Sequence, residues 1–154
     1  RIPSSSIGDI RLMLDLPQGR GPDPLETVRI RQVLSPDNEL WKPDRNADVL
    51  VLGDSFSNIY SMPSMGWGES AGLAEQLAFY LQRPVDRISQ NDDGAFATRE
   101  LLRREMAAGP EAKRSAYVKA GGDRLGVKRV VVWQFAAREL AFGDWRVFPV
   151  TPSP

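Results

Sequence analysis

The chain contains no cysteine and no histidine, and each absence excludes a class of chemistry. Without cysteine there is no disulfide and no thiolate metal site. Without histidine as well, a zinc or copper centre would need carboxylates alone, so we expect no metal and no other cofactor. A serine nucleophile would also lack its usual base within these 154 residues, because histidine normally takes the serine proton.

Net charge and long apolar runs are also missing. Twenty basic residues balance twenty acidic ones, so the chain has no overall electrostatic attraction for nucleic acid or for an anionic membrane. No apolar run approaches the roughly 18 residues that a membrane-spanning helix needs. We therefore expect no nucleic-acid partner and no transmembrane helix within this sequence.

What is present fits one soluble globular domain. The apolar fraction of 42% and the charged fraction of 26% are ordinary for such a domain. We assign residues 1–150 to the domain and 151–154 to a tail. The opening RIPSSSIGDI has no starting Met and no signal-peptide pattern, so it reads as the interior of a longer sequence. We expect the domain to be incomplete in this chain.

Hydrophobic periodicity predicts alternating strands and helices. The expected strands are 27–34, 48–54, 84–89 and 128–135, of which 48–54 and 128–135 are apolar enough to be buried on both faces. The expected helices are 4–17, 66–84, 95–108, a weaker one at 110–126, and a short one at 136–143, with an edge strand at 145–150. This order predicts an α/β fold with a parallel sheet flanked by helices.

Function in such a sheet lies beyond the carboxyl ends of the strands, which here points to loops 54–65, 90–94 and 133–139. Ser55 directly follows a buried strand in Gly-Asp-Ser, where its hydroxyl could act as a nucleophile and its N–H could face an oxyanion. Asp54 precedes it and is a poor candidate for a direct base. The same residues also suit a simple helix cap, so the motif alone leaves both interpretations open.

The other two loops carry further candidates. Asn91 and Gly94 are suitable oxyanion donors, although Asn-Asp-Asp-Gly is also ordinary turn chemistry. Gln134 and Arg138 are candidates for binding substrate or for supporting the site. Trp67, like Trp133, could stack on a sugar ring, although aromatic residues are more often part of a core.

Four segments together carry a resemblance to a known family. ADVLVLGDSFSNIYS (47–61) and MGWGESAGLAEQLAFYLQRPVDRI (65–88) resemble the serine block of the SGNH hydrolase-like proteins of alginate O-acetylation. NDDGAFATRELL (91–102) and KRVVVWQFAARELAFGDW (128–145) are similar to the downstream blocks of that family. The resemblance covers about residues 6–146, and it implies an SGNH or flavodoxin-like three-layer fold.

The resemblance implies a periplasmic or membrane-tethered enzyme that transfers acetyl groups to a polysaccharide hydroxyl. A partner membrane acyltransferase would supply the acetyl group, and Ser55 would carry it as an acyl-enzyme. The Ser55 N–H, with Gly94 or Asn91, would form the oxyanion hole. In this family an Asp-x-His motif before the serine block supplies the base, and RIPSSSIGDIRLMLDLP resembles the segment that follows this motif.

We therefore expect the base to lie in a missing N-terminal half and the 154-residue chain alone to be essentially inactive. Such a chain should expose a sheet edge and associate with its missing half or with itself. Two alternatives stay open. One is an acetylesterase of the same fold, and the other is a non-catalytic carbohydrate-binding or scaffold domain. The lack of a basic stripe is awkward for an anionic polymer unless basic residues lie elsewhere.

Overall fold

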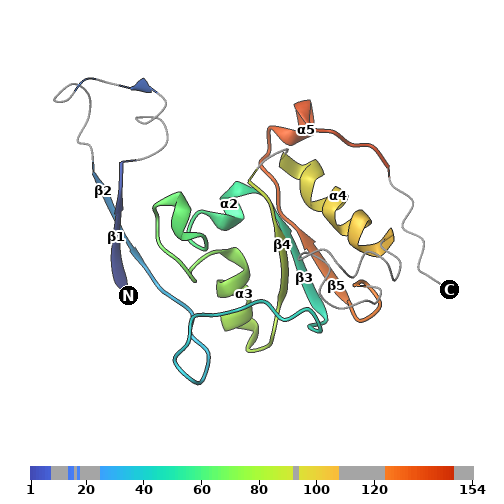
Figure 1. Ribbon diagram of the computed structural model, residues 1–154, viewed down its shortest axis with the longest axis horizontal. Helices are drawn as coiled ribbons and strands as arrows, with labels where there is room; N and C mark the ends of the chain where they lie inside the picture. The colour runs from blue at the N-terminus through green and yellow to red at the C-terminus, as the bar shows by residue number, and fades with distance from the viewer. Residues whose placement is uncertain (8–13, 16, 18–24, 92–93, 108–123, 148–154) are drawn as a thin grey trace.

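The computed structural model describes residues 1–7, 14–15, 17, 25–91, 94–107 and 124–147. Figure 1 shows a hairpin beside a sheet that carries helices on both faces. The strands are β1 (Ile2–Ser6), β2 (Glu26–Ile30), β3 (Val49–Gly53), β4 (Asp86–Ser89) and β5 (Val130–Trp133). The helices are α2 (Ser55–Asn58), the 3₁₀ turn η1 (Pro63–Met65), α3 (Leu73–Leu81), α4 (Gly94–Ala107) and α5 (Glu139–Phe142).

The three strands β4, β3 and β5 form a parallel sheet in that order. Leu50 of β3 is aligned with Asp86 of β4 on one side and with Val131 of β5 on the other. All five residues of β3 are buried, as its continuous apolar run predicts for a central strand. The expected parallel sheet is confirmed.

Successive side chains of β3 point to opposite faces, and each face has its own core. The core on the α3 side consists of Val49, Val51, Ala74, Ala78 and Val85. The core on the α4 side consists of Leu50, Leu52, Ile88 and Leu102. Figure 1 shows α3 and α4 on opposite sides of the sheet, so the α/β architecture with helices on both faces is confirmed.

The predicted helix at 4–17 is wrong at its start. Residues Ile2–Ser6 form β1, which pairs antiparallel with β2 from Ile2 opposite Ile30 to Ser6 opposite Glu26. The Ser5 and Thr27 hydroxyls are 2.8 Å apart across the pair. Pairing with β2 decides the conformation of Ile2–Ser6, and a local pattern of apolar residues does not reveal such a partner. Residues 8–13 lie outside the described part.

The predicted burial of β5 on both faces is also wrong. Val130 is 49% exposed and Val131 is 47% exposed, because among the described residues β5 has a partner strand on one side alone. The proposed edge strand at 145–150 is not formed over residues 145–147, and 148–150 lie outside the described part. Most of the proposed helix 110–126 lies outside it as well.

The helix expected over 66–84 is shorter, because α3 begins at Leu73. Gly68 has φ of 108°, and a Cβ there would lie 2.4 Å from Cδ1 of Ile30, so this position requires glycine. The segment before α3 is therefore a loop packed against β2. At its other end α3 stops at Gln82, which is left-handed at φ 52°.

A buried ion cluster joins β4, α4 and the segment that precedes β5. The Arg124 guanidinium donates to both oxygens of Asp86 at 2.6 and 2.8 Å and to Glu105 at 2.6 Å. Lys128 Nζ lies 3.0 Å from Asp86. These side chains are almost fully buried, and the sequence analysis did not anticipate them.

Candidate functional site

The candidate site lies at the carboxyl end of β3. From β3 the chain passes through α3 to β4 on one side, and then through α4 to β5 on the other side. The direction in which strands are added therefore reverses at β3. In open parallel sheets, ligands bind in the crevice outside the carboxyl ends at such a reversal.

Ser55 is the first residue of α2 and follows β3 after Asp54 alone. The residue is half-buried. Within the described part of the chain its hydroxyl has no hydrogen-bond partner, whereas the neighbouring Ser57 hydroxyl donates to the carbonyl of Asp54 at 2.8 Å. Ser55 is thus partly accessible to solvent, and its hydroxyl forms no hydrogen bond with the described residues.

Asp54 holds two of the predicted loops together. Its Oδ1 accepts the N–H of Phe56 at 2.9 Å, and its Oδ2 accepts the N–H of Ala136 at 2.7 Å. Its own N–H donates to Oε1 of Gln134 at 3.2 Å. Because both carboxylate oxygens are engaged and the residue is buried, Asp54 positions Ser55 and is poorly suited to act as its base.

Gly53 is required at the turn between β3 and α2. A Cβ at this position would lie 2.0 Å from the Ser57 hydroxyl oxygen, and the Ser57 side chain is itself buried. The same hydroxyl lies 3.1 Å from that of Ser89 at the end of β4. The close approach of α2 to the sheet therefore depends on a residue without a side chain.

The third predicted loop meets the same region. The Gln90 N–H donates to the carbonyl of Gly53 at 3.0 Å. The Asn58 side chain donates to Oδ1 of Asn91 at 2.8 Å, and Nδ2 of Asn91 contacts the Met62 sulfur at 3.6 Å. All three loops thus meet at this edge of the sheet, as the sequence predicts.

The oxyanion-hole candidates have different surroundings. The Asn91 amide is directed to α2 and Met62 in this structure. Gly94 is the first residue of α4, where backbone N–H groups lack helical partners. The Ser55 N–H opens α2. The Ser55 and Gly94 N–H groups thus each stand at the start of a helix, whereas the Asn91 amide is engaged with Asn58 and Met62.

The residue after Ser55 is exposed and has a cationic neighbour. Phe56 is 58% exposed, and the Arg138 guanidinium carbon lies 5.9 Å from the centre of its ring. Nε of Arg138 is 3.8 Å from Glu139, which is a loose ion pair. Arg138 therefore keeps an accessible cationic group over the Phe56 ring, whereas the Gln134 side-chain oxygen already accepts the N–H of Asp54.

Of the tryptophans considered for sugar stacking, Trp67 is buried and Trp133 packs among other aromatic rings. Trp67 is 8% exposed, so its ring offers no open face to a ligand. Trp133 packs against Phe135 and Trp145 with ring centres 5.0 and 5.4 Å away. The Arg99 guanidinium carbon lies 4.9 Å from the Trp133 ring centre.

Sequence reasoning missed a buried support beneath α2. Glu75 of α3 accepts the Ser61 hydroxyl at 2.8 Å and pairs with Arg87 of β4 at 2.7 Å. The glutamate within the apolar segment of α3 was the one sign in the sequence of this buried polar contact. Its partners could not be found from spacing, because they come from a loop and from the next strand.

In the described ranges, no group of three or more acidic residues could hold a metal ion, and no helix is both long and apolar enough to cross a membrane. No family model, no curated protein and no solved structure matches the chain.

Proposed function

We propose that this chain carries the serine nucleophile of an SGNH-like O-acetyltransferase that modifies an exopolysaccharide such as alginate. The observation that supports this best is the half-buried, uncommitted hydroxyl of Ser55 at the carboxyl end of a central parallel strand. The three-loop arrangement around it is also typical of α/β enzymes. A periplasmic location and a membrane acyltransferase donor belong to the same proposal.

In the first step, Oγ of Ser55 attacks the carbonyl carbon of the acetyl donor and loses its proton to a base. The Ser55 and Gly94 N–H groups, or the Asn91 amide after a rotation, donate to the resulting oxyanion. The donor leaving group departs with a proton, which leaves acetyl-serine. In the second step, a sugar hydroxyl attacks the acetyl carbon and gives its proton to the base. The bond from that carbon to Oγ of Ser55 then breaks, Oγ takes the proton back from the base, and the acetylated sugar leaves.

The base is the component that this sequence does not supply. There is no histidine in the chain, and the Asp54 carboxylate is occupied by two backbone N–H groups. We propose that an Asp-x-His segment outside these 154 residues provides it. Transfer to water in place of sugar would make the same site an acetylesterase.

A non-catalytic carbohydrate-binding domain is the second candidate. It is favoured by the lack of any base in contact with the Ser55 hydroxyl among the described residues. In that case Ser55 would have a structural role, as the first residue of α2, and no catalytic one.

A rescue experiment with an external base separates the two. We expect the purified chain to show no serine-dependent hydrolysis of 4-nitrophenyl acetate, because loss of a triad base costs about four to six orders of magnitude. Added imidazole should restore hydrolysis above its own background in the wild type and in Ser64→Ala, which removes an exposed serine of η1.

In Ser55→Ala, added imidazole should give no more hydrolysis of 4-nitrophenyl acetate than imidazole gives without protein. Equal imidazole-dependent rates in the wild type and Ser55→Ala would contradict the nucleophile and favour the binding domain. Serine-dependent turnover without imidazole would contradict the external base.

A further inference from the structure

Met62 lies beside the candidate site and carries an oxidisable sulfur. The residue is 37% exposed. Its backbone is fixed on both sides, because its N–H donates to the carbonyl of Asn58 at 3.0 Å and its carbonyl accepts the N–H of Met65 at 3.0 Å. The chain has four methionines and no cysteine. Methionine sulfur is therefore the group in this protein that a mild peroxide oxidises most readily.

The sulfur of Met62 contacts one of the oxyanion-hole candidates. Nδ2 of Asn91 lies 3.6 Å from Sδ of Met62, and Oδ1 of the same amide accepts the side-chain N–H of Asn58 at 2.8 Å. Asn58 is the last residue of α2, three residues after Ser55, and it is 2% exposed. The contact with Met62 is weak, because a thioether sulfur is a poor hydrogen-bond acceptor.

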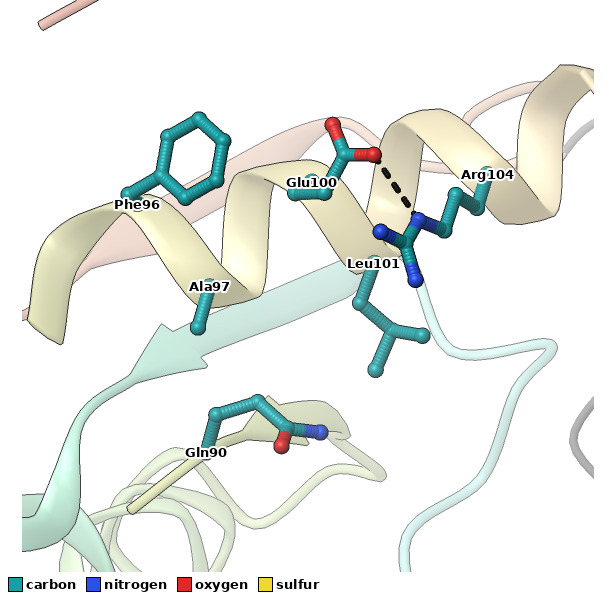
Figure 2. Close-up of a pocket in the computed structure, with 6 residues that line it drawn as sticks. All are labelled: Gln90, Phe96, Ala97, Glu100, Leu101 and Arg104. Atoms are coloured by element: carbon teal, nitrogen blue, oxygen red, sulfur yellow. Dashed lines mark hydrogen bonds and ion pairs between the residues drawn. The ribbon is translucent and has the colours of Figure 1, made fainter. Parts of the chain in front are cut away.

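The Asn91 side chain is the part of its loop that can change position. The N–H of Gln90 donates to the carbonyl of Gly53 at 3.0 Å, which fixes the backbone just before Asn91. The Gln90 side chain lines a pocket of about 200 Å³ together with side chains of α4, as Figure 2 shows. Within the described part of the chain, the Asn91 amide is held by Asn58 and Met62. Its rotation requires these two contacts to break.

We propose that Met62 is a peroxide-sensitive modification site whose oxidation holds the Asn91 amide against α2. The sulfur lone pair attacks one oxygen of hydrogen peroxide, so an S–O bond forms as the O–O bond breaks. The departing hydroxide takes the proton of the transferred oxygen and becomes water. The sulfur is oxidised by two electrons to the sulfoxide, and the peroxide is reduced.

The sulfoxide strengthens the contact with Asn91. Its oxygen is a better acceptor than the thioether sulfur, and an N–H···O bond has its donor and acceptor about 2.9 Å apart. This separation is shorter than the 3.6 Å between Nδ2 and Sδ, so the added oxygen can replace the sulfur as acceptor after a small adjustment. Because Met62 is exposed, the polar oxygen also remains in contact with water and does not enter either core.

The effect on activity rests on the proposed function. In that mechanism Asn91 donates to the oxyanion only after its amide rotates away from α2. One added hydrogen bond to the resting amide lowers the rotated population about two- to tenfold. Oxidation of Met62 therefore reduces the activity of the site, and reduction of the sulfoxide restores it.

Solvent exchange of side-chain amide protons tests the contact without reference to catalysis. The 154-residue chain is treated with dilute hydrogen peroxide, peptide mapping locates the added oxygen, and NMR follows the amide protons of Asn91 and Gln90. We expect Met62 to be oxidised faster than Met65, which is less exposed. Exchange at Asn91 should then slow about two- to tenfold. Exchange at Gln90, which lines the pocket beside α4, should not change.

Met62→Leu and Met62→Gln form a matched pair of variants. Leucine replaces methionine with little change of volume and has no sulfur, so peroxide should leave Asn91 exchange unchanged in Met62→Leu. Glutamine carries an amide oxygen near the position of the sulfoxide oxygen, so Met62→Gln should slow Asn91 exchange without peroxide. In the oxidised wild type, a methionine sulfoxide reductase should return the exchange rate to its original value.

Imidazole-dependent hydrolysis of 4-nitrophenyl acetate measures the consequence for the site. Peroxide should lower the Ser55-dependent rate about two- to tenfold in the wild type and leave it unchanged in Met62→Leu. Oxidation of Met62 no faster than that of Met65, or unchanged Asn91 exchange after oxidation, would overturn the proposal.

Two further outcomes separate this proposal from the proposed function. Slower Asn91 exchange with an unchanged Ser55-dependent rate would overturn the control of the site by Met62 and leave the nucleophile in place. If no form of the chain shows Ser55-dependent hydrolysis, the proposed function is wrong, and the exchange rates still decide whether oxidised Met62 holds Asn91.

Discussion

At the scale of single residues, two neighbours position Ser55. Gly53 has no side chain, and both carboxylate oxygens of Asp54 already accept backbone N–H groups. Gly53 allows α2 to approach the sheet, and Asp54 joins the loops after β3 and β5. The sequence identified Ser55 because a buried strand ends at this point. The partners of Asp54 could not be predicted, since Gln134 and Ala136 lie about eighty residues further along the chain.

Asp54→Asn should destabilise the protein. Both carboxylate oxygens of Asp54 accept backbone N–H groups, so one of them would meet the donor NH₂ of asparagine. We expect a loss of about 1–3 kcal/mol in the free energy of unfolding, measured by urea denaturation. Asp37→Asn is the control, because Asp37 is exposed in a loop. Equal stability of the two variants would show that the loops are held together by other contacts.

At the scale of elements, local patterns located most of the sheet and its helices. The apolar run of β3 and the periodicity of α3 and α4 were sufficient to locate these elements. The residues that each of them buries form a recognisable pattern within its own short stretch of sequence. Local patterns failed for β1, whose strand conformation depends on pairing with β2. They also failed for the burial of β5, because the composition of a strand does not reveal whether it has neighbours on both sides.

The ion cluster predicts a stability effect between elements. Asp86→Asn removes a charge that compensates buried Arg124 and Lys128. Breaking a buried pair from one side typically costs about 3–5 kcal/mol, so we expect a loss of this size in urea denaturation at pH 7. Asp48→Asn is the matched control, because its pair with Arg83 is more exposed and should contribute about 0–1 kcal/mol.

The same cluster predicts the direction of an acid effect. Burial raises the pKa of Asp86, but the hydrogen bonds and charges of Arg124 and Lys128 outweigh it, so the folded-state pKa lies below 3.8. The stabilisation is therefore present above pH 3.8 and is lost as the pH falls toward the folded-state pKa. The stability of Asp86→Asn should fall less steeply than that of the wild type in this range. Parallel profiles would rule out Asp86 as the titrating group.

At the scale of the whole molecule, the described sheet has an apolar edge at β5. Val130 and Val131 are about half exposed, and strand edges of this kind promote pairing with another chain. We predict concentration-dependent self-association of the purified chain in sedimentation velocity. Val131→Lys should reduce it, whereas Tyr80→Lys at an exposed position of α3 should not. A monomer at every concentration, or equal behaviour of the two lysine variants, would contradict this prediction.

The central claim is that Ser55 carries an acetyl group, and the most direct test is intact mass spectrometry followed by peptide mapping. The protein is joined to an upstream Asp-x-His segment and incubated with an activated acetyl ester. We predict one acetyl group on Ser55, absent from Ser55→Ala and from the 154-residue chain without the added segment. A folded protein that gains no acetyl group, or gains it equally in Ser55→Ala, would contradict the account.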